Sequence, residues 1–522
     1  MVHHHHHHRI SYFQQLRKGE AQQQQQHPDF MEPHHCPSFM YHDYFNYRKS
    51  KLAALRFLFL FSLLSCSFFF GPRLLFYSLG TEYESELQTR TEEENRGAAP
   101  CSSMANNTIC CDRTAFRTDV CYMRGDVRTH SPSNSILLFD NNSTTAPSIE
   151  EKIRPYTRKW ETSIMDTIDE LRLRTAGAGD LDNHRCDVRH DVPAVVFSTG
   201  GYTGNVYHEF NDGIIPLYIT SHHFNRQVVF VMLEYHDWWM TKYSDVVSRL
   251  SAHPPIDYSN DRRTHCFSEV IVGLRIHDEL TVESDRMESN KTVLDFRQLL
   301  DEAYTPRVRT LMRAEEQATA SLLKPVTERN VSAKEKPKLV VVSRNGSRAI
   351  ENEGELVKLA EGVGFEVKVL RPERTTELAR IYQALNSCDA MVGVHGAAMT
   401  HFLFMRPGSV FIQIVPLGTD WAAETYYGEP AKKMGLRYFP YKILPRESSL
   451  YREYRKGDPV LRDPESVNAK GWQVTKKVYL DGQNVRVDLA RFRKRLFRAQ
   501  QYIVSRKTSM NLRWRQQGRR QR

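Results

Sequence analysis

Three short segments of the chain combine glycines with imidazole, carboxylate or guanidinium groups. The first, residues 199–212 (TGGYTGNVYHEFND), places His208, Glu209 and Asp212 on the first turns of an expected helix. His208 and Asp212 are four residues apart and therefore share one helix face. An acid and an imidazole at the edge of a cleft can take a proton from a hydroxyl group. First-turn acids that complement the helix dipole explain the same pattern equally well without catalysis.

The second segment, residues 343–348 (SRNGSR), directly follows the apolar run KLVVVS. Guanidinium groups are planar, charged donors, so Arg344 and Arg348 at a strand end can bind a diphosphate. A basic loop that only contacts solvent is the alternative.

The third segment, residues 393–401 (GVHGAAMTH), joins a buried strand to a helix of small residues. Small residues let a ligand approach the first N–H groups of a helix, which favour phosphate. His395 would then lie beside the phosphate or a sugar. A buried histidine with a structural hydrogen bond is the alternative interpretation.

Each segment follows an expected strand, within an alternation of short apolar runs and helical stretches that is typical of βαβ units. The first array has strands at 194–198, 228–233 and 269–274 and helices at 205–223 and 291–323. The second has strands at 338–343, 366–370, 389–394 and 409–415 and helices at 351–363, 376–387, 397–404, 421–434 and 488–505. We expect two doubly wound α/β domains whose strand ends face a shared cleft, where such sheets bind ligands. A single dinucleotide-binding domain is disfavoured because no G-x-G-x-x-G follows a strand.

The net charge of +10 on 522 residues comes from one end of the chain. Residues 489–522 hold twelve Lys or Arg and no acid, so the remainder has 60 basic and 62 acidic residues. The charge distribution therefore does not predict a basic groove across the folded part of the chain, and we do not expect nucleic acid as a partner. A hydrophobic content of 40% excludes a mainly disordered chain.

An uncharged segment at 57–71 (FLFLFSLLSCSFFFG) predicts a membrane anchor. It is short for a span of about 20 residues, but Arg56 and Arg73 at its ends can snorkel. Basic residues precede it and acidic residues follow it, which predicts a cytosolic N-terminus and a lumenal body. A short, Phe-rich span suits a thin bilayer of the early secretory pathway or Golgi. A cleaved signal peptide is the alternative.

Cysteines and glycosylation sequons agree with a lumenal body. Seven cysteines follow residue 80, four of them within 101–121, which predicts disulfides and at least one unpaired thiol. The sequons expected to carry glycans are Asn106, Asn141, Asn142, Asn290 and Asn330. We expect Asn345 to stay unmodified, because a glycan there would crowd the two arginines.

Composition divides the chain into six parts. They are a low-complexity cytoplasmic tail (1–51), a transmembrane signal anchor (52–79), a stem and Cys-rich cap (80–190), two α/β domains (191–335 and 336–487) and a terminal helix with a basic tail (488–522). The cap is expected to be irregular or rich in β-structure.

The three segments, in this order and behind a signal anchor, resemble glycosyltransferase family 61, in particular its plant branch that decorates xylan. Residues 420–431 (DWAAETYYGEPA) and 480–485 (LDGQNV) add to the resemblance, which extends from about Ala194 to Asp488. It implies a GT-B fold in the Golgi lumen, with 191–335 as the acceptor-side domain and 336–487 as the nucleotide-sugar domain. It also implies inversion by single displacement, in which Asp212 or Glu209, aided by His208, deprotonates a xylan hydroxyl. Family members often carry Asp where this chain has Glu209.

The same resemblance implies how UDP would be stabilised as it departs, without a metal or other cofactor. The residues implied in donor binding are Arg344, Arg348, His395, Gly396, Ala397, Trp421 and Glu424. The only D-x-D, at 180–182, precedes the first domain strand, so we assign it no metal. Expected partners are a UDP-pentose, xylan or xylo-oligosaccharide, the Golgi membrane and other enzymes of xylan synthesis.

The residues do not by themselves distinguish the two pentosyl donors of the resembled branch. We favour α-1,3-arabinofuranosyl transfer, with β-1,2-xylosyl transfer on xylan as the alternative. A non-catalytic lumenal glycan-binding or scaffold protein of the same fold is the alternative from another class. The presence of Arg344, Arg348, His395 and Asp212 argues against that alternative.

Overall fold

The computed structural model describes residues 101, 104–139, 149–180, 182–322 and 336–520. The expected cytoplasmic tail, signal anchor and first part of the stem lie outside these residues, as do Asn141, Asn142 and Asn330. Among the described helices, none combines the length and the apolar composition that a membrane crossing needs.

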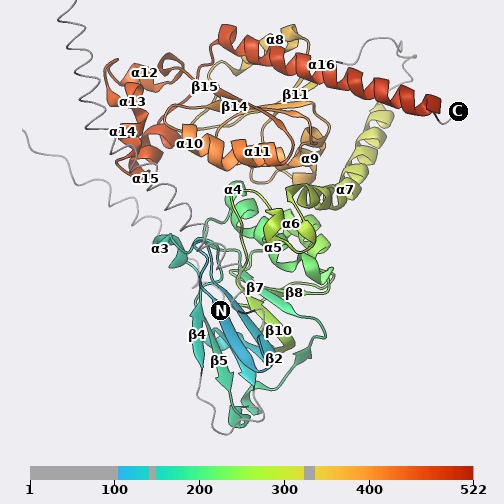
Figure 1. Ribbon diagram of the computed structural model, residues 1–522, viewed down its shortest axis with the longest axis vertical. Helices are drawn as coiled ribbons and strands as arrows, with labels where there is room; N and C mark the ends of the chain where they lie inside the picture. The colour runs from blue at the N-terminus through green and yellow to red at the C-terminus, as the bar shows by residue number, and fades with distance from the viewer. Residues whose placement is uncertain (1–100, 102–103, 140–148, 181, 323–335, 521–522) are drawn as a thin grey trace, which may run out of the picture. The chain divides into compact units, whose positions relative to one another are not determined.

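A mixed sheet forms the N-terminal half of the described chain (Figure 1). Its order is β4-β5-β3-β2-β10-β7-β8-β9, with β1 on β2 and β6 on β10. The strands are β1 Thr108–Asp112, β2 Val120–His130, β3 Ser135–Phe139, β4 Glu150–Ile153, β5 Leu171–Ala176, β6 Val188–Arg189, β7 Ala194–Ser198, β8 Val229–Leu233, β9 Ile256–Asp257 and β10 His265–Val272.

The expectation of a doubly wound parallel sheet is wrong for this half. Strands β10, β7, β8 and β9 are parallel neighbours, but β2 runs antiparallel to both β10 and β3. The reason is that strands β1–β5, from the segment expected to form a separate cap, extend the parallel strands through the pairing of β2 with β10. The sheet therefore continues across the boundary that we placed between residues 190 and 191.

Helices cover one face of this sheet. They are α4 Val206–His208, a π-helical turn η4 Glu209–Ile214, α5 Ile215–Ser221 and α6 Asp237–Leu250. Helix α7 Val293–Leu322 packs against α6 and against the second half, and a short α3 Thr162–Met165 lies elsewhere. Alternate residues of β7 belong to different cores, as the period of a strand requires. Val195 and Phe197 join the cluster with the helices, whereas Ala194 and Val196 join a cluster built almost entirely from strands.

The C-terminal sheet has five parallel strands in the order β12-β11-β13-β14-β15. They are β11 Lys338–Val342, β12 Glu366–Leu370, β13 Ala390–Val394, β14 Val410–Val415 and β15 Arg437–Lys442, the last of which the sequence analysis missed. Leu339 and Val341 contribute to one core and Val340 and Val342 to another, so both faces are covered. This half therefore has the expected doubly wound arrangement.

The helices of this half lie on both faces of its sheet. They are α8 Glu353–Val363, α9 Leu378–Asn386, a 3₁₀ segment η8 Ala397–Phe404, α10 Asp420–Ala423, a π-helical turn η9 Glu424–Gly428, α11 Glu429–Lys433, α12 Leu450–Glu453, α13 Pro459–Arg462, α14 Pro464–Asn468, α15 Trp472–Thr475 and α16 Leu489–Arg520. Figure 1 shows α8 and α16 together along one face. The final helix, expected to end at 505, continues to Arg520. Phe492, Leu496 and Ala499 bury its inner face.

The two halves share a hydrophobic core. One cluster contains Phe197 and Tyr218 from the first half and Tyr382 and Phe404 from the second. Buried Arg297 on α7 donates through Nε to the carbonyl oxygen of Met405, at 2.9 Å. The described residues belong to one compact unit, so side chains of the two halves can form one site.

Three disulfides confirm that cysteines pair within the first half. They join Cys101 to Cys110, Cys111 to Cys121 and Cys186 to Cys266. Cys388 is buried and free, which accounts for the odd number of cysteines.

Candidate active site

The glycine-rich segment follows β7 and leads into the helix that carries His208 and Asp212. Asn205 caps that helix, because its side chain accepts a hydrogen bond from the N–H of Tyr207. The π-helical turn that follows widens the helix. It still leaves His208 Nδ1 only 2.6 Å from Asp212 Oδ2. The structure therefore brings these two predicted residues together as a hydrogen-bonded pair.

The carboxylate of Asp212 is buried and surrounded by hydrogen-bond donors. Its Oδ2 accepts from Arg158 Nε at 2.9 Å, and its Oδ1 accepts from the Asn211 amide at 2.7 Å. Burial acts to raise the pKa of Asp212, but the hydrogen bond from His208 and the charge of Arg158 outweigh it, so the pKa lies below its usual value. Asp212 is thus an ionised, enclosed carboxylate that orients a neighbour.

His208 is the member of the pair that solvent can reach. Two groups lie near its Nδ1, the Asp212 carboxylate at 2.6 Å and Arg158 Nη2 at 3.1 Å. The closer acceptor assigns the proton to Nδ1, and the free lone pair is then on Nε2. The ring of Tyr202 stacks on the imidazole with centroids 4.1 Å apart. This geometry suits a general base held by a carboxylate.

Glu209, the other predicted acid, has structural partners on both carboxylate oxygens. Oε1 accepts from the N–H of Gly204 at 2.6 Å, and Oε2 accepts from Trp239 Nε1 at 2.5 Å. Burial raises the pKa of Glu209 despite these hydrogen bonds. The side chain therefore closes the glycine-rich turn and fixes α6 against it.

Arg158 is a site residue that the sequence analysis missed. It lies fifty residues before His208, in the segment expected to be a cap, and no motif surrounds it. Besides Asp212 it contacts Glu161, through Nη1 at 2.8 Å. The nearby carboxylates, Asp212 first among them, outweigh burial and raise the pKa of Arg158. Only the pairing of the early strands with the α/β sheet brings this arginine to the site.

The two predicted arginines of the second half meet over Gly396. A Cβ on Gly396 would lie 2.1 Å from Arg344 Nη1 and 3.5 Å from Arg348 Nη1, so only glycine permits this approach. Arg344 also donates to the carbonyl oxygen of His395, at 3.4 Å. The segments after β11 and β13 converge here, at the point where the strand order reverses.

The guanidinium groups of Arg344 and Arg348 are partly buried, and no carboxylate of the described residues pairs with them. In the part of the chain that the structure describes, neither Arg344 nor Arg348 forms an ion pair, and the Nε atom of each is buried without a partner. Burial lowers the pKa of Arg348 to about 10, with a further contribution from Arg344, and burial also lowers the pKa of Arg344. Two cations without an ion-pair partner, beside a helix start, are an arrangement that can bind a diphosphate.

The imidazole of His395, close to Arg344 and Arg348, is buried and neutral. Its Nδ1 accepts from Gln413 Nε2 at 3.0 Å, and Gln413 Oε1 in turn accepts from the hydroxyl of Tyr438 at 2.7 Å. Burial and the two arginines lower its pKa to about 3. His395 therefore supports the turn as a hydrogen-bonded core histidine.

Two tyrosines of η9 lie between the histidine site and the arginine site. The Tyr427 ring is 5.4 Å from the ring of His395 and 5.9 Å from that of Tyr207. The Tyr426 ring is 5.4 Å from the same Tyr207, whose own ring is 5.1 Å from that of His208. The chain of ring contacts thus runs from His208 to His395, next to the arginine cluster, across the two halves.

Other predicted donor residues are distributed over two further hollows. Ala397 lines a cavity of about 540 Å³ between the glycine-rich turn and the loop after β12, together with Lys242 and Arg374. Trp421 and Glu424 line a separate hollow of about 360 Å³. Glu424 there pairs with Lys432 at 2.5 Å.

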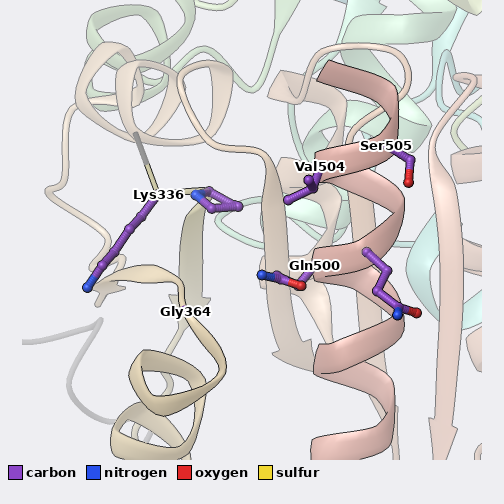
Figure 2. Close-up of a pocket in the computed structure, with 7 residues that line it drawn as sticks. Lys336, Gly364, Gln500, Val504 and Ser505 are labelled. Carbon is purple, nitrogen blue, oxygen red and sulfur yellow. The ribbon is translucent and has the colours of Figure 1, made fainter. Parts of the chain in front are cut away.

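A further cavity, of about 610 Å³, lies at the opposite end of the second sheet from Arg344 and Arg348, and Figure 2 shows its lining residues. Lys336, Gly364, Gln500, Val504 and Ser505 line it. Lys336 and Gly364 precede β11 and β12, so this cavity is at the amino ends of two strands, whereas Arg344 and Arg348 follow the carboxyl end of β11.

The described sequons Asn106, Asn290 and Asn345 are all exposed. Exposure makes each accessible to a glycan, and Asn345 lies between the two donor-site arginines in sequence.

Two α/β sheets that share a cleft, a carboxylate-held imidazole on one side and unpaired arginines on the other are the features of a group-transfer enzyme with an anionic donor. A sequence profile of the glycosyltransferase 61 family matches residues 207–412, which include both sites. The "Xylan glycosyltransferase MUCI21" of Arabidopsis thaliana is 56% identical over 463 residues, which cover 87% of this chain and 92% of that protein. This chain belongs to the glycosyltransferase 61 family and is a glycosyltransferase.

Two rice relatives are more distant. The "Alpha-1,3-arabinosyltransferase XAT3" of Oryza sativa subsp. japonica is 36% identical over 390 residues, covering 74% of this chain and 64% of the relative. The "Beta-1,2-xylosyltransferase XYXT1" of the same species is 36% identical over 405 residues, covering 74% of this chain and 83% of the relative.

Proposed function

We propose that this glycosyltransferase moves a pentosyl group from a UDP-pentose to a hydroxyl of xylan, with inversion at the anomeric carbon. The observation that carries this proposal is the opposition of His208, held by buried Asp212, to the unpaired Arg344 and Arg348 across the η9 tyrosines. The names of the relatives, which refer to xylan, arabinosyl transfer and xylosyl transfer, support the choice of acceptor and donor.

The proposed reaction is one displacement. The acceptor oxygen forms a bond to the anomeric carbon while the bond from that carbon to the UDP oxygen breaks. His208 Nε2 takes the hydroxyl proton, and Asp212 stabilises the imidazolium that forms. A carboxylate was the expected base, but donors enclose Asp212, and Gly204 and Trp239 occupy both oxygens of Glu209.

The departing UDP is the anion that the arginine cluster would hold. Arg344 and Arg348 present charged donors that need no rearrangement, and the N–H groups at the start of η8 lie beside them. This charge replaces a metal in the proposal, so transfer should persist in EDTA.

For the donor sugar we propose arabinofuranose, with α-1,3 linkage to a backbone xylose. Transfer of xylose in β-1,2 linkage is the second candidate, because the rice xylosyltransferase and the rice arabinosyltransferase are equally similar to this chain, each 36% identical. We further propose a GT-B enzyme anchored in the Golgi membrane by residues 52–79, with its catalytic body in the lumen, where it encounters other enzymes of xylan synthesis.

A donor panel tests the proposal. The secreted lumenal part, from about residue 100, is incubated in EDTA with xylohexaose and either UDP-arabinofuranose or UDP-xylose. UDP release, together with linkage analysis of the product, should identify one pentosyl donor and one linkage. Absence of turnover with both donors would overturn the proposed function.

A further inference from the structure

Two exposed aromatic rings from different loops stack beside the catalytic pair. Phe116, 72% exposed, and Trp160, 37% exposed, have ring centroids 5.2 Å apart and planes inclined by only 13°. Large apolar side chains are costly to expose, and a stacked pair on a surface indicates a binding platform.

Arg158 connects this platform to the base. Its guanidinium carbon is 5.1 Å from the centroid of Trp160, while its Nε binds Asp212. Arg117 lies over the same indole at 5.3 Å, so the ring of Trp160 is held in place by two cations. Arg158 therefore joins the platform to Asp212, the residue that orients His208.

A second exposed pair belongs to the other half. Trp421, 46% exposed, and Trp472, 47% exposed, have centroids 6.4 Å apart. Trp421 is 5.7 Å from Tyr426, which also contacts Tyr207 beside the base. Aromatic rings therefore extend from the catalytic region in both halves of the molecule.

We propose that Phe116 with Trp160, and Trp421 with Trp472, bind acceptor sugars on the two sides of the xylose that is modified. This inference rests on the proposed function and deepens it, because it assigns the enzyme to internal positions of a polysaccharide chain. The ligand is a β-linked chain of neutral pyranoses, whose C–H faces stack on aromatic rings. An uncharged ligand fits this chemistry, because Phe116 leaves most of its surface exposed on the pair that it forms with Trp160, and Trp421 and Trp472, inclined by 73°, each leave about half of theirs exposed to apolar contact.

The test compares acceptors of two lengths in the lumenal protein. The measured quantity is the ratio of kcat/KM for xylohexaose to kcat/KM for xylotriose. Trp160→Ala and Trp421→Ala should each lower this ratio about tenfold, which corresponds to about 1.4 kcal/mol. Phe497→Ala is the matched control, because Phe497 is 52% exposed on α16, and its ratio should equal that of the wild type. A variant that merely perturbed the fold would affect both acceptors equally and leave the ratio unchanged.

Each outcome decides the inference. Ratios that remain at the wild-type value in both tryptophan variants overturn it. A higher KM for the UDP-sugar in Trp421→Ala, without a change of ratio, would assign that ring to the donor and overturn the proposal for the second pair. If no variant and no wild-type protein transfers any sugar, the proposed function has failed, and affinity electrophoresis in soluble xylan then tests the platform alone. Retardation that Trp160→Ala abolishes and Phe497→Ala retains would support it, and equal mobility of all three proteins would overturn it.

Discussion

Replacement of His208 by asparagine removes the proposed base and preserves its hydrogen bond to Asp212. The asparagine amide nitrogen can occupy the place of imidazole Nδ1 and donate to Asp212 Oδ2, now 2.6 Å away. It has no atom at the position of Nε2, so it cannot accept the acceptor's proton. Asp212→Asn is a less direct test, because it leaves Arg158 partly buried without its nearest carboxylate.

The expected loss of activity in His208→Asn follows from the proposed role of His208 as a general base. A positioned general base contributes about 10²- to 10⁴-fold. At about 1.36 kcal/mol per factor of ten, the barrier should rise by about 3–5 kcal/mol. The arginine cluster lies on the other half of the protein and does not contact the His208 side chain, so UDP affinity should be unaffected. Stability should also remain close to wild type, since the buried Asp212–Arg158 pair at 2.9 Å is intact.

The assay is UDP release with xylohexaose, with calorimetry of UDP binding on the same protein. His222→Asn is the matched control, because His222 is near the end of the same helical run and contacts Tyr218 instead of the acid. A His208→Asn protein that retains more than about a tenth of wild-type kcat refutes the reasoning. Full loss in Glu209→Gln with activity in His208→Asn would instead make Glu209 the base.

Four further expectations concern the other predicted residues. Arg344→Ala and Arg348→Ala should each weaken UDP binding about 10- to 100-fold in calorimetry, since a hydrogen bond to a charged group contributes about 1.5–3 kcal/mol; unchanged affinity would remove that arginine from the donor site. Glu209→Gln should keep transfer within about threefold yet lower the free energy of unfolding by about 1–3 kcal/mol in urea titrations, because a buried acceptor is lost; wild-type stability would contradict its structural role. The pKa of His395 is lowered from 6.5 to about 3, so between these values the unfolded chain binds more protons and stability falls as pH falls. His395→Gln should therefore reduce the pH dependence of unfolding between pH 6.5 and 5 by up to about 1.4 kcal/mol per unit, and an unaltered slope would exclude this cause. Peptide mass spectrometry should find Asn345 without a glycan, and a glycopeptide there would show that the turn tolerates one.

Short apolar runs bounded by polar turns predicted the parallel strands well, because such runs are compatible with few other secondary structures. The strands at 194–198 and 366–370 coincide with β7 and β12. Strand β15, Arg437–Lys442, was missed because it contains a proline and is less continuously apolar, as an edge strand can be. The mixed character of the first sheet was missed because antiparallel pairing of β2 with β10 joins residues more than a hundred positions apart.

The candidate site shows the same division between local and distant information. Spacing of four residues on a helix was sufficient to predict that His208 and Asp212 lie together. It could not show which of them solvent reaches, because that depends on Arg158 and on Asn211 around the carboxylate. Nor could it separate Glu209 from catalysis, since its partner Trp239 is thirty residues away on another helix.

The proposed reaction needs a neutral acceptor side and a positively charged donor side, and the two charge clusters of the site differ in this way. The charge of Asp212 is balanced locally by Arg158, and the imidazole of His208 donates a hydrogen bond to the same carboxylate, so the acceptor side can meet a neutral hydroxyl without long-range charge. Arg344 and Arg348 are both cationic and partly buried, and neither forms an ion pair with a carboxylate of the described residues. Mutual repulsion and desolvation of such a pair destabilise the empty site, and an anion between them removes both costs. In the proposed reaction, this pair would therefore favour the state in which negative charge has moved onto the diphosphate, which is the change that occurs as the donor bond breaks.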